Sequence, residues 1–149
     1  MAEVRVDFYQ LGTGDRAESA LPPIARNTLN AGERLLIVSA DSEQLGRIAE
    51  ALWSHSPDSF LANGLAGAEH EAHQPILLSG DTAARNGARF MAIADGLWRE
   101  ADPGFARTFF VFDDGTLQAA RDCWRMLGTR DGVERRFWKR EQGKWREGP

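Results

Sequence analysis

The residues best suited to chemistry lie near the end of the chain, where two arginines flank a tryptophan. Arg121, Trp124 and Arg125 are spaced by three and one positions, so a helix would bring them to one side. A guanidinium group donates two hydrogen bonds in a fixed plane, which matches a carboxylate, and an indole supplies an apolar wall. The pattern predicts a shallow pocket for a carboxylate-bearing chain end. The alternative is a tryptophan at the edge of the core between two solvated arginines.

A helix that ends at Gly128 is expected to position these three side chains. Asp113, Asp114 and Thr116 follow an apolar strand and are typical of a helix N-terminus. The two aspartates also have the chemistry of magnesium ligands, and we assign them to the helix cap. At 100° per residue, the core face of this helix consists of Ala119, Ala120, Cys123, Met126 and Leu127.

The charge of the chain is distributed unevenly. The segment Arg121–Arg146 contains nine basic and four acidic residues, whereas the whole chain carries a net charge of −4. Trp124, Trp138 and Trp145 lie inside this basic segment. Such a surface suits an acidic partner, either nucleic acid or an acidic peptide. Direct stacking of nucleic-acid bases on Trp138 or Trp145 is therefore one alternative function.

Strands that alternate with helices over short connections predict a single α/β domain over residues 1–149. We expect a Rossmann-like three-layer fold with a mainly parallel sheet and an antiparallel C-terminal edge. Apolar or alternating patterns predict strands at Val4–Tyr9, Leu35–Val38, Pro75–Ser79, Arg89–Ala94, Thr108–Phe112 and Val133–Lys139, with Lys144–Trp145 completing a hairpin. Helices are expected from Pro22–Pro23 to about Asn30 and from Asp41 or Ser42 to Ser54. Ser54–Gln74 is predicted to be a long loop.

A glycine motif follows the first predicted strand. Gly12–Ala17 fits Gly-x-Gly-x-x-Ala, and Asp41 follows the second strand, as in dinucleotide-binding domains. A dinucleotide-dependent oxidoreductase is therefore a second alternative. We favour a surface loop and predict no cofactor. The helix is expected to begin well past the glycines, and Asp15 would place a negative charge at the phosphate site.

Other residue types do not indicate a catalytic or metal centre. His70, His73 and Glu69 share a polar loop in which no predicted helix or strand fixes them, so we predict no metal site. The chain of 149 residues has no apolar run near the roughly 20 residues of a membrane span, and the pattern at residues 1–11 predicts a strand rather than a secretory leader. With a single cysteine, Cys123, it is expected to be a cytoplasmic protein.

A second aromatic cluster lies around the end of the helix that reaches Ser54. Trp53 falls at the edge of the apolar face of that helix, and Phe60 and Leu61 follow in the loop after Pro57. Large apolar side chains in a loop either fold back onto the core or form a patch for a partner. The pattern alone leaves both possibilities open.

The order and spacing of these motifs resemble the chi subunit family of the bacterial DNA polymerase III holoenzyme. The resemblance runs through Phe8–Leu11, Arg34–Ile37, Glu50–Trp53, Ser59–Phe60, Asn63–Gly67, Ala120–Arg121, Trp124–Arg125 and Lys144–Trp145. The most specific part is the block Ala-Leu-Trp, Ser-Phe and Leu-Ala-Gly. In the family, position 124 is often tyrosine, and residues 134–149 are longer and more charged here.

The resemblance implies a non-catalytic accessory protein with a Rossmann-like fold and no working nucleotide site. It implies binding to the psi subunit of the clamp-loader assembly through a surface with Trp53, Phe60 and Leu61. It also implies that Arg121, Trp124 and Arg125 bind the acidic C-terminal tail of single-stranded-DNA-binding protein. DNA would then be reached mainly indirectly, and the chain would be a monomer or part of a heterodimer.

Overall fold

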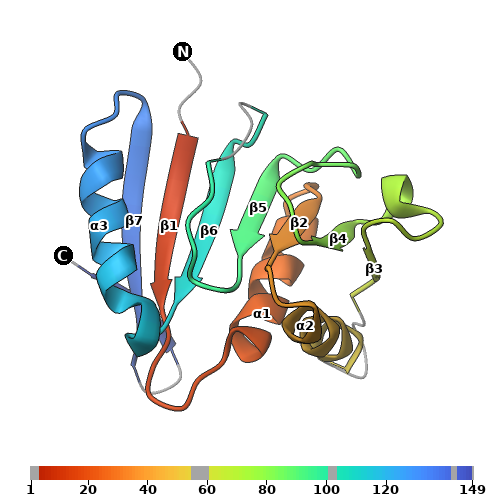
Figure 1. The fold of residues 1–149 in the computed structure, drawn as a ribbon, viewed down its shortest axis with the longest axis horizontal. Helices are drawn as coiled ribbons and strands as arrows, with labels where there is room; N and C mark the ends of the chain where they lie inside the picture. Colours follow the sequence, from red (N-terminus) through yellow and green to blue (C-terminus); the bar gives the residue numbers. More distant parts are fainter. Residues whose placement is uncertain (1–3, 55–60, 101–103, 142–143, 149) are drawn as a thin grey trace.

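The computed structural model describes residues 4–54, 61–100, 104–141 and 144–148, which form one eight-stranded sheet (Figure 1). The strand order is β3-β4-β2-β5-β6-β1-β7-β8. Every neighbouring pair is parallel except β7 and β8, which confirms the predicted antiparallel edge. The strands are β1 Val4–Gln10, β2 Leu35–Val38, β3 Asn63–Leu65, β4 Ile76–Ser79, β5 Phe90–Ile93, β6 Arg107–Phe112, β7 Val133–Glu141 and β8 Lys144–Glu147.

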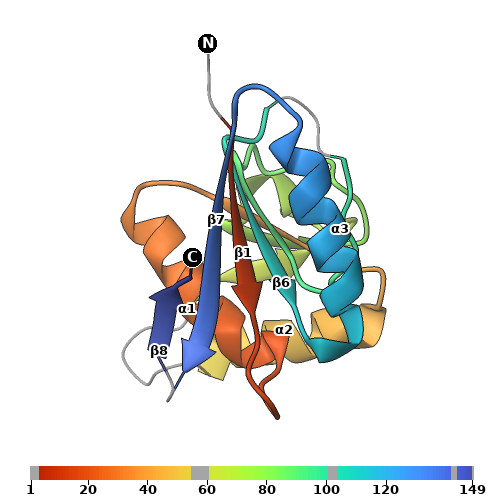
Figure 2. The same cartoon turned by 90° about the vertical axis from the view of Figure 1, so that its left-hand side faces the viewer.

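Helices cover both faces of the sheet and confirm the three-layer architecture. The helices α1 (Ala17–Asn30) and α2 (Ser42–Ser54) pack in the cluster on one face, and α3 (Leu117–Gly128) packs in the cluster on the other. Figure 2 shows α1 and α3 on opposite sides of β1 and β7. Short 3₁₀ turns are formed by Glu71–His73 and Asp114–Thr116. In the part of the chain that the structure describes, no helix has the length and hydrophobicity needed to cross a bilayer.

The central strands are apolar on both sides because each face of the sheet is covered. In β2, Leu35 and Ile37 pack in the cluster under α1 and α2, whereas Leu36 and Val38 belong to the cluster under α3. All four side chains are fully buried. Burial of about 25 cal/mol per Å² of apolar surface makes these two clusters the main source of stability.

The first helix begins earlier than predicted. It begins at Ala17, so Pro22 and Pro23 lie inside it rather than in its first turn. Each proline removes one N–H donor from the helix. The buried face that contains Ala17, Ala20, Leu21 and Ile24 nevertheless packs on the sheet, and this packing outweighs the two missing hydrogen bonds.

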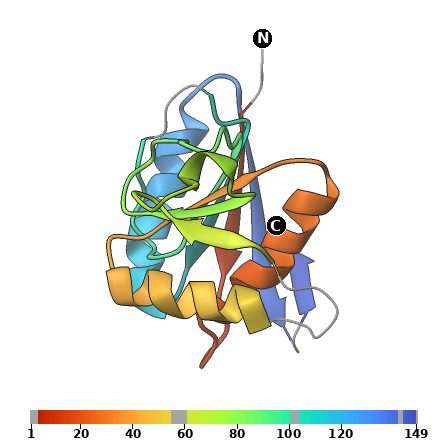
Figure 3. The same cartoon turned by 90° about the vertical axis from the view of Figure 1, so that its right-hand side faces the viewer.

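A short edge strand interrupts the predicted loop Ser54–Gln74. Asn63–Leu65 forms β3 and pairs in parallel with β4, and this edge of the sheet faces the viewer in Figure 3. Asn-Gly-Leu has no alternating or β-branched pattern, so its extended conformation depends on pairing with β4. The side-chain amide of Asn63 donates a 2.9 Å hydrogen bond to the Leu61 carbonyl and holds the turn that enters the strand.

The first strand lies between β6 and β7, and its alternation separates two environments. Val6 and Phe8 point toward α3, together with Gln10 at the end of the strand. Asp7 and Tyr9 point toward the opposite face. Because β7 pairs with β1 from Val4–Val133 to Gln10–Lys139, each β7 side chain points to the same face of the sheet as its partner in β1.

Candidate functional site

The 3₁₀ turn Asp114–Thr116, which leads directly into α3, is closed by a reciprocal cap. The Thr116 backbone N–H donates to Asp113 Oδ1 at 3.1 Å, and the Asp113 N–H donates to Thr116 Oγ1 at 3.1 Å. Asp113 is therefore a cap, as assigned, but of this short turn rather than of α3 itself, and Asp114 lies within the turn. Ala120, Cys123 and Leu127 are buried against the sheet, which turns Arg121 and Arg125 outward. The expectation that Ala119 belongs to the core face is wrong, because this residue is exposed.

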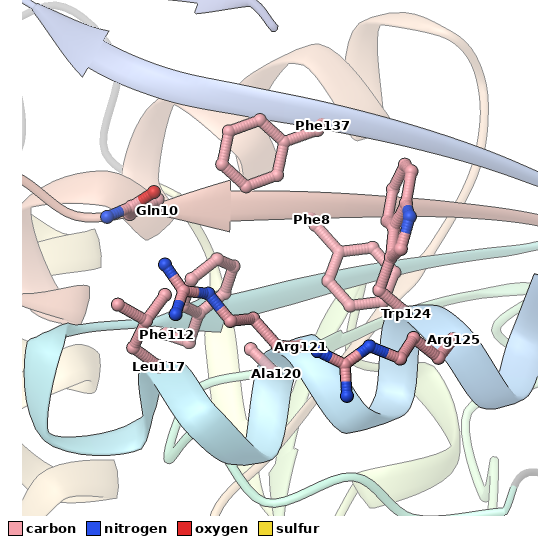
Figure 4. A pocket seen from close by; sticks show the side chains of 9 residues that line it. All are labelled: Phe8, Gln10, Phe112, Leu117, Ala120, Arg121, Trp124, Arg125 and Phe137. Atoms are coloured by element: carbon pink, nitrogen blue, oxygen red, sulfur yellow. The ribbon is translucent and has the colours of Figure 1, made fainter. Parts of the chain in front are cut away.

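A hollow of about 300 Å³ lies between α3 and the strands β1, β6 and β7 (Figure 4). Its apolar lining includes Phe8, Phe112 and Phe137, one from each strand. Figure 4 shows the Arg121 side chain extending along α3 toward Phe112 and Leu117, at the end of the hollow where Gln10 lies. The structure therefore brings Arg121, Trp124 and Arg125 together around one aromatic pocket.

Trp124 is half-buried and fixed in position at one end of this pocket. Its ring meets Phe8 edge-on at a centroid distance of 5.1 Å and Phe137 at 6.3 Å. The Arg135 guanidinium lies 4.3 Å from the centre of the indole ring and donates a 2.7 Å hydrogen bond to the Trp124 carbonyl. The indole is thus a rigid wall, and neither sealed in the interior nor loose on the surface.

The two arginines predicted to bind an anion are not consumed by internal ion pairs. Arg125 makes one long contact, 3.6 Å to Asp122, and its side chain is 72% exposed. Within residues 4–54, 61–100, 104–141 and 144–148, Arg121 has no hydrogen-bond or ion-pair partner. A carboxylate that enters from solvent can therefore bind Arg121 without displacing an internal acid. Exposed contacts like the one from Arg125 contribute little and exchange readily.

The other walls of the pocket were not predicted from the sequence. Phe8, Gln10, Phe112 and Phe137 lie on strands that approach only through long-range pairing. Alternation along residues 4–10 does place Phe8 and Gln10 on the same face, but it does not show which helix covers them. Arg135, which packs on Trp124, had no indication in the sequence beyond its basic neighbourhood.

The chain is similar to proteins of a known family. A family model described as the DNA polymerase III chi subunit matches residues 3–134. The chain belongs to the DNA polymerase III chi subunit family. The DNA polymerase III subunit chi of Escherichia coli (strain K12) is 28% identical over 114 residues, which cover 72% of this chain and 76% of the relative. Most of β7 and all of β8 lie beyond residue 134, where the family match ends.

The second predicted surface of this chi-family chain is only partly as expected. Trp53 at the end of α2 is 48% exposed, and Leu65 at the end of β3 is 49% exposed. The expectation that Leu61 belongs to the exposed surface is corrected, because it is 6% exposed and packs in the core beneath α2. Its backbone N–H donates to the Leu52 carbonyl at 3.0 Å, which turns the side chain inward. Phe60 lies outside the described residues.

The glycine loop of this chi-family chain differs from the prediction in one respect. Since α1 begins at Ala17, the helix follows the loop directly, and the expected late start is wrong. The Gly12 N–H donates to Asp15 Oδ2 at 2.9 Å, so a carboxylate occupies the position that a phosphate would need. The hollow at this end of the sheet is lined by two arginines, Arg16 and Arg47, and by five acidic residues: Asp15, Glu18, Asp41, Asp95 and Asp113. The excess of negative charge opposes binding of a pyrophosphate.

The histidines and the cysteine do not form a reactive centre where the structure describes them. His70 and Glu69 are exposed and 3.7 Å apart, and the described residues contain no group of three or more His, Cys, Asp or Glu placed to hold a metal. Burial raises the pKa of the Cys123 thiol to about 12, with the negative charge of Glu100 as a second cause. At neutral pH this thiol is protonated and is a poor nucleophile.

The tryptophans of the C-terminal hairpin are engaged with the sheet. Trp138 stacks on Tyr9 at a centroid distance of 6.1 Å and an angle of 11°, and Trp145 meets Tyr9 edge-on at 5.0 Å. Both indoles are partly buried against the core. The observed geometry does not favour the alternative in which nucleic-acid bases stack on these two rings, because the rings already pack on Tyr9.

Proposed function

We propose that this chain is a non-catalytic accessory subunit of the replicative polymerase that holds it to coated single-stranded DNA. In this proposal, the pocket under α3 binds the C-terminal end of the acidic tail of single-stranded-DNA-binding protein. The observation that carries the proposal is the combination of an aromatic pocket with two exposed guanidinium groups at its rim. Membership in the chi subunit family supports the role in replication.

The pocket suits a peptide that ends in an aromatic residue with a free carboxylate. The ring would pack against Phe8, Phe112 and Phe137, and the carboxylate would accept hydrogen bonds from Arg121 and Arg125. Two charge-assisted hydrogen bonds contribute roughly 1.5–3 kcal/mol each, and burial of about 150–200 Å² of ring adds roughly 4–5 kcal/mol. After ordering costs of several kcal/mol, we expect micromolar affinity or weaker. A tetramer that offers several tails would raise the effective affinity.

A second surface, around Trp53, is proposed to bind the psi subunit. Its support is the exposure of two large apolar side chains, Trp53 and Leu65, at the edge of the sheet where α2 packs beside β3 (Figure 1). Exposed indoles are frequent anchors of protein interfaces. Co-purification of the chain with the psi subunit, before and after the change Trp53→Ser, tests this half of the proposal.

Calorimetric titration with a tail peptide tests the first half. Arg121→Ala is expected to weaken binding by at least about tenfold, because it removes a charge-assisted hydrogen bond. Amidation of the peptide's terminal carboxyl group should weaken binding by a similar factor. Arg26→Ala, which removes an exposed arginine from α1 on the other face of the sheet, is the matched control and should leave affinity unchanged.

Equal affinity of the Arg121→Ala variant and the parent for the free-acid peptide would remove Arg121 from the site. Equal affinity of the parent for the free acid and the amide would show that the pocket does not recognise a chain end.

A further inference from the structure

One row of cross-strand register partners runs from the pocket to the edge of the C-terminal hairpin. Phe112, Gln10, Lys139 and Arg146 are successive register partners across β6, β1, β7 and β8. Phe112 and Gln10 line the pocket. Cross-strand partners point to the same face, so the side chains of Lys139 and Arg146 continue from the pocket along the α3 side of the sheet.

Alternation along β7 agrees with this placement. Phe137 lines the pocket, and Lys139 is two residues further on, so both lie on the same face. Neighbouring strands are about 4.8 Å apart, which places the Lys139 backbone about 5 Å and the Arg146 backbone about 10 Å from that of Gln10. An extended peptide covers this distance in about three residues. A chain that leaves the pocket past Gln10 would therefore cross both cations.

Lys139 differs from the arginines on the other face of the hairpin in how its charge is compensated. On the face toward α1, Arg136 pairs with Glu134 at 3.1 Å and with Glu147 at 3.8 Å, and Arg140 lies 3.8 Å from Asp15. On the face toward α3, exposed Lys139 has no hydrogen-bond or ion-pair partner within the described part of the chain.

Lys139 lies directly opposite Arg146, another exposed cation. Cross-strand partners share a face of the sheet, so these two cationic side chains lie next to each other beside the pocket. An acidic peptide segment that leaves the pocket on this side would be attracted by both charges.

We propose that Lys139 and Arg146 form an extension of the pocket that binds the acidic residues preceding the end of a bound peptide. This inference rests on the proposed tail binding, and it adds a second contact region that selects for negative charge upstream of the terminal residue. Lys139 and Arg146 lie beyond residue 134, where the family match ends.

The test compares two peptides that end in the same aromatic residue. One carries aspartates at the preceding positions, and the other carries asparagines there. The parent should bind the aspartate peptide roughly three- to tenfold more tightly at low salt, because each exposed ion pair contributes about 0.2–1 kcal/mol. In the variant Lys139→Ala/Arg146→Ala this preference should fall to near unity, while affinity for the asparagine peptide stays unchanged. The single variant Lys139→Ala should show part of the loss, and Arg26→Ala should show none.

An undiminished aspartate preference in the double variant would overturn the proposal, provided that thermal melting shows the variant to be folded. Failure of the parent to bind either peptide would instead refute the tail binding on which the proposal rests. Bare oligothymidylate is included as a probe. If the parent bound this oligonucleotide and the double variant did not, the extension formed by Lys139 and Arg146 would be a nucleic-acid site, and the peptide proposal would be overturned.

Discussion

On each side of β1, arginine and tryptophan side chains lie together, but their polar groups are paired internally on only one side. Toward α1, the fully buried Asp7 accepts hydrogen bonds from Arg5 at 2.9 Å, from Arg107 at 2.7 Å and from the Trp138 indole N–H at 2.9 Å. Toward α3, Arg121 and Trp124 line a pocket in which the structure describes no internal carboxylate bound to Arg121. An arginine beside an aromatic ring is thus a structural unit where the chain supplies its own acid, and we propose that it is a receptor where the acid comes from a partner.

The largest effect expected from this comparison is on stability. Asp7→Ala removes the common acceptor of two arginines and one indole, so we expect the free energy of unfolding to fall by about 2–4 kcal/mol. Denaturant unfolding measures this loss. Asp122→Ala is the control, because its exposed contact with Arg125 is worth less than about 0.5 kcal/mol. A loss below about 1 kcal/mol in Asp7→Ala would mean that the buried cluster is not a structural anchor.

A smaller effect is expected from alkaline pH. Burial and, second to it, the negative charge of Asp7 raise the pKa of Tyr9 to about 12, while Arg107 and Arg5 oppose this shift. Since the folded-state value lies above the unfolded value near 10, the stabilisation is complete below about pH 10 and is lost as pH rises toward 12. The loss is of order 2 kcal/mol.

Tyr9 is the only tyrosine of the chain, so the ultraviolet absorbance of tyrosinate reports its ionisation directly. Tyr9→Phe should reduce the dependence of stability on pH in this range. Since the Cys123 thiol also titrates near pH 12, the comparison is made against the parent rather than against a flat line. If Tyr9 ionised near pH 10 in the folded protein, its side chain would not be buried beside Asp7 as described.

The smallest effect on stability is expected from Arg125, at the solvent-exposed rim of the pocket under α3. Arg125→Ala should change the free energy of unfolding by less than about 0.5 kcal/mol, because its side chain is 72% exposed and its contact with Asp122 is long. Affinity for the tail peptide should fall, but by less than in Arg121→Ala, since Asp122 competes for this guanidinium in the free protein. A larger affinity loss for Arg125→Ala than for Arg121→Ala would reverse the assigned order of the two arginines.

Local patterns in the sequence were sufficient to predict the parts of the site that one helix carries. The helical period placed Cys123 and Leu127 inward and Arg121 and Arg125 outward. The sequence around the helix does not show which residues pack against it. Phe8 and Phe137 both contact Trp124 because β1 pairs with β7. The opposing wall of a pocket depends on tertiary pairing, which local spacing does not encode.

The predicted fold class was confirmed, and the errors lie where packing overrides local preference. Pro22 and Pro23 favour a helix start, yet burial of Ala17 and Ala20 extends α1 in front of them. Asn63–Leu65 has the composition of a turn, yet the exposed edge of β4 makes it a strand. The loop pattern around Leu61 did not predict whether its side chain is buried. The hydrogen bond from its backbone N–H to the Leu52 carbonyl turns the side chain toward the core.

The central place of β1 has a consequence for biosynthesis. This strand precedes both of its neighbours in the chain, because β6 and β7 begin only at Arg107 and Val133. During synthesis β1 therefore has no strand partners until these segments are made, and in that interval aggregation and chaperone binding compete with folding. The aromatic hollow closes only after residue 137 has left the ribosome, so a shorter nascent chain lacks one wall of the pocket.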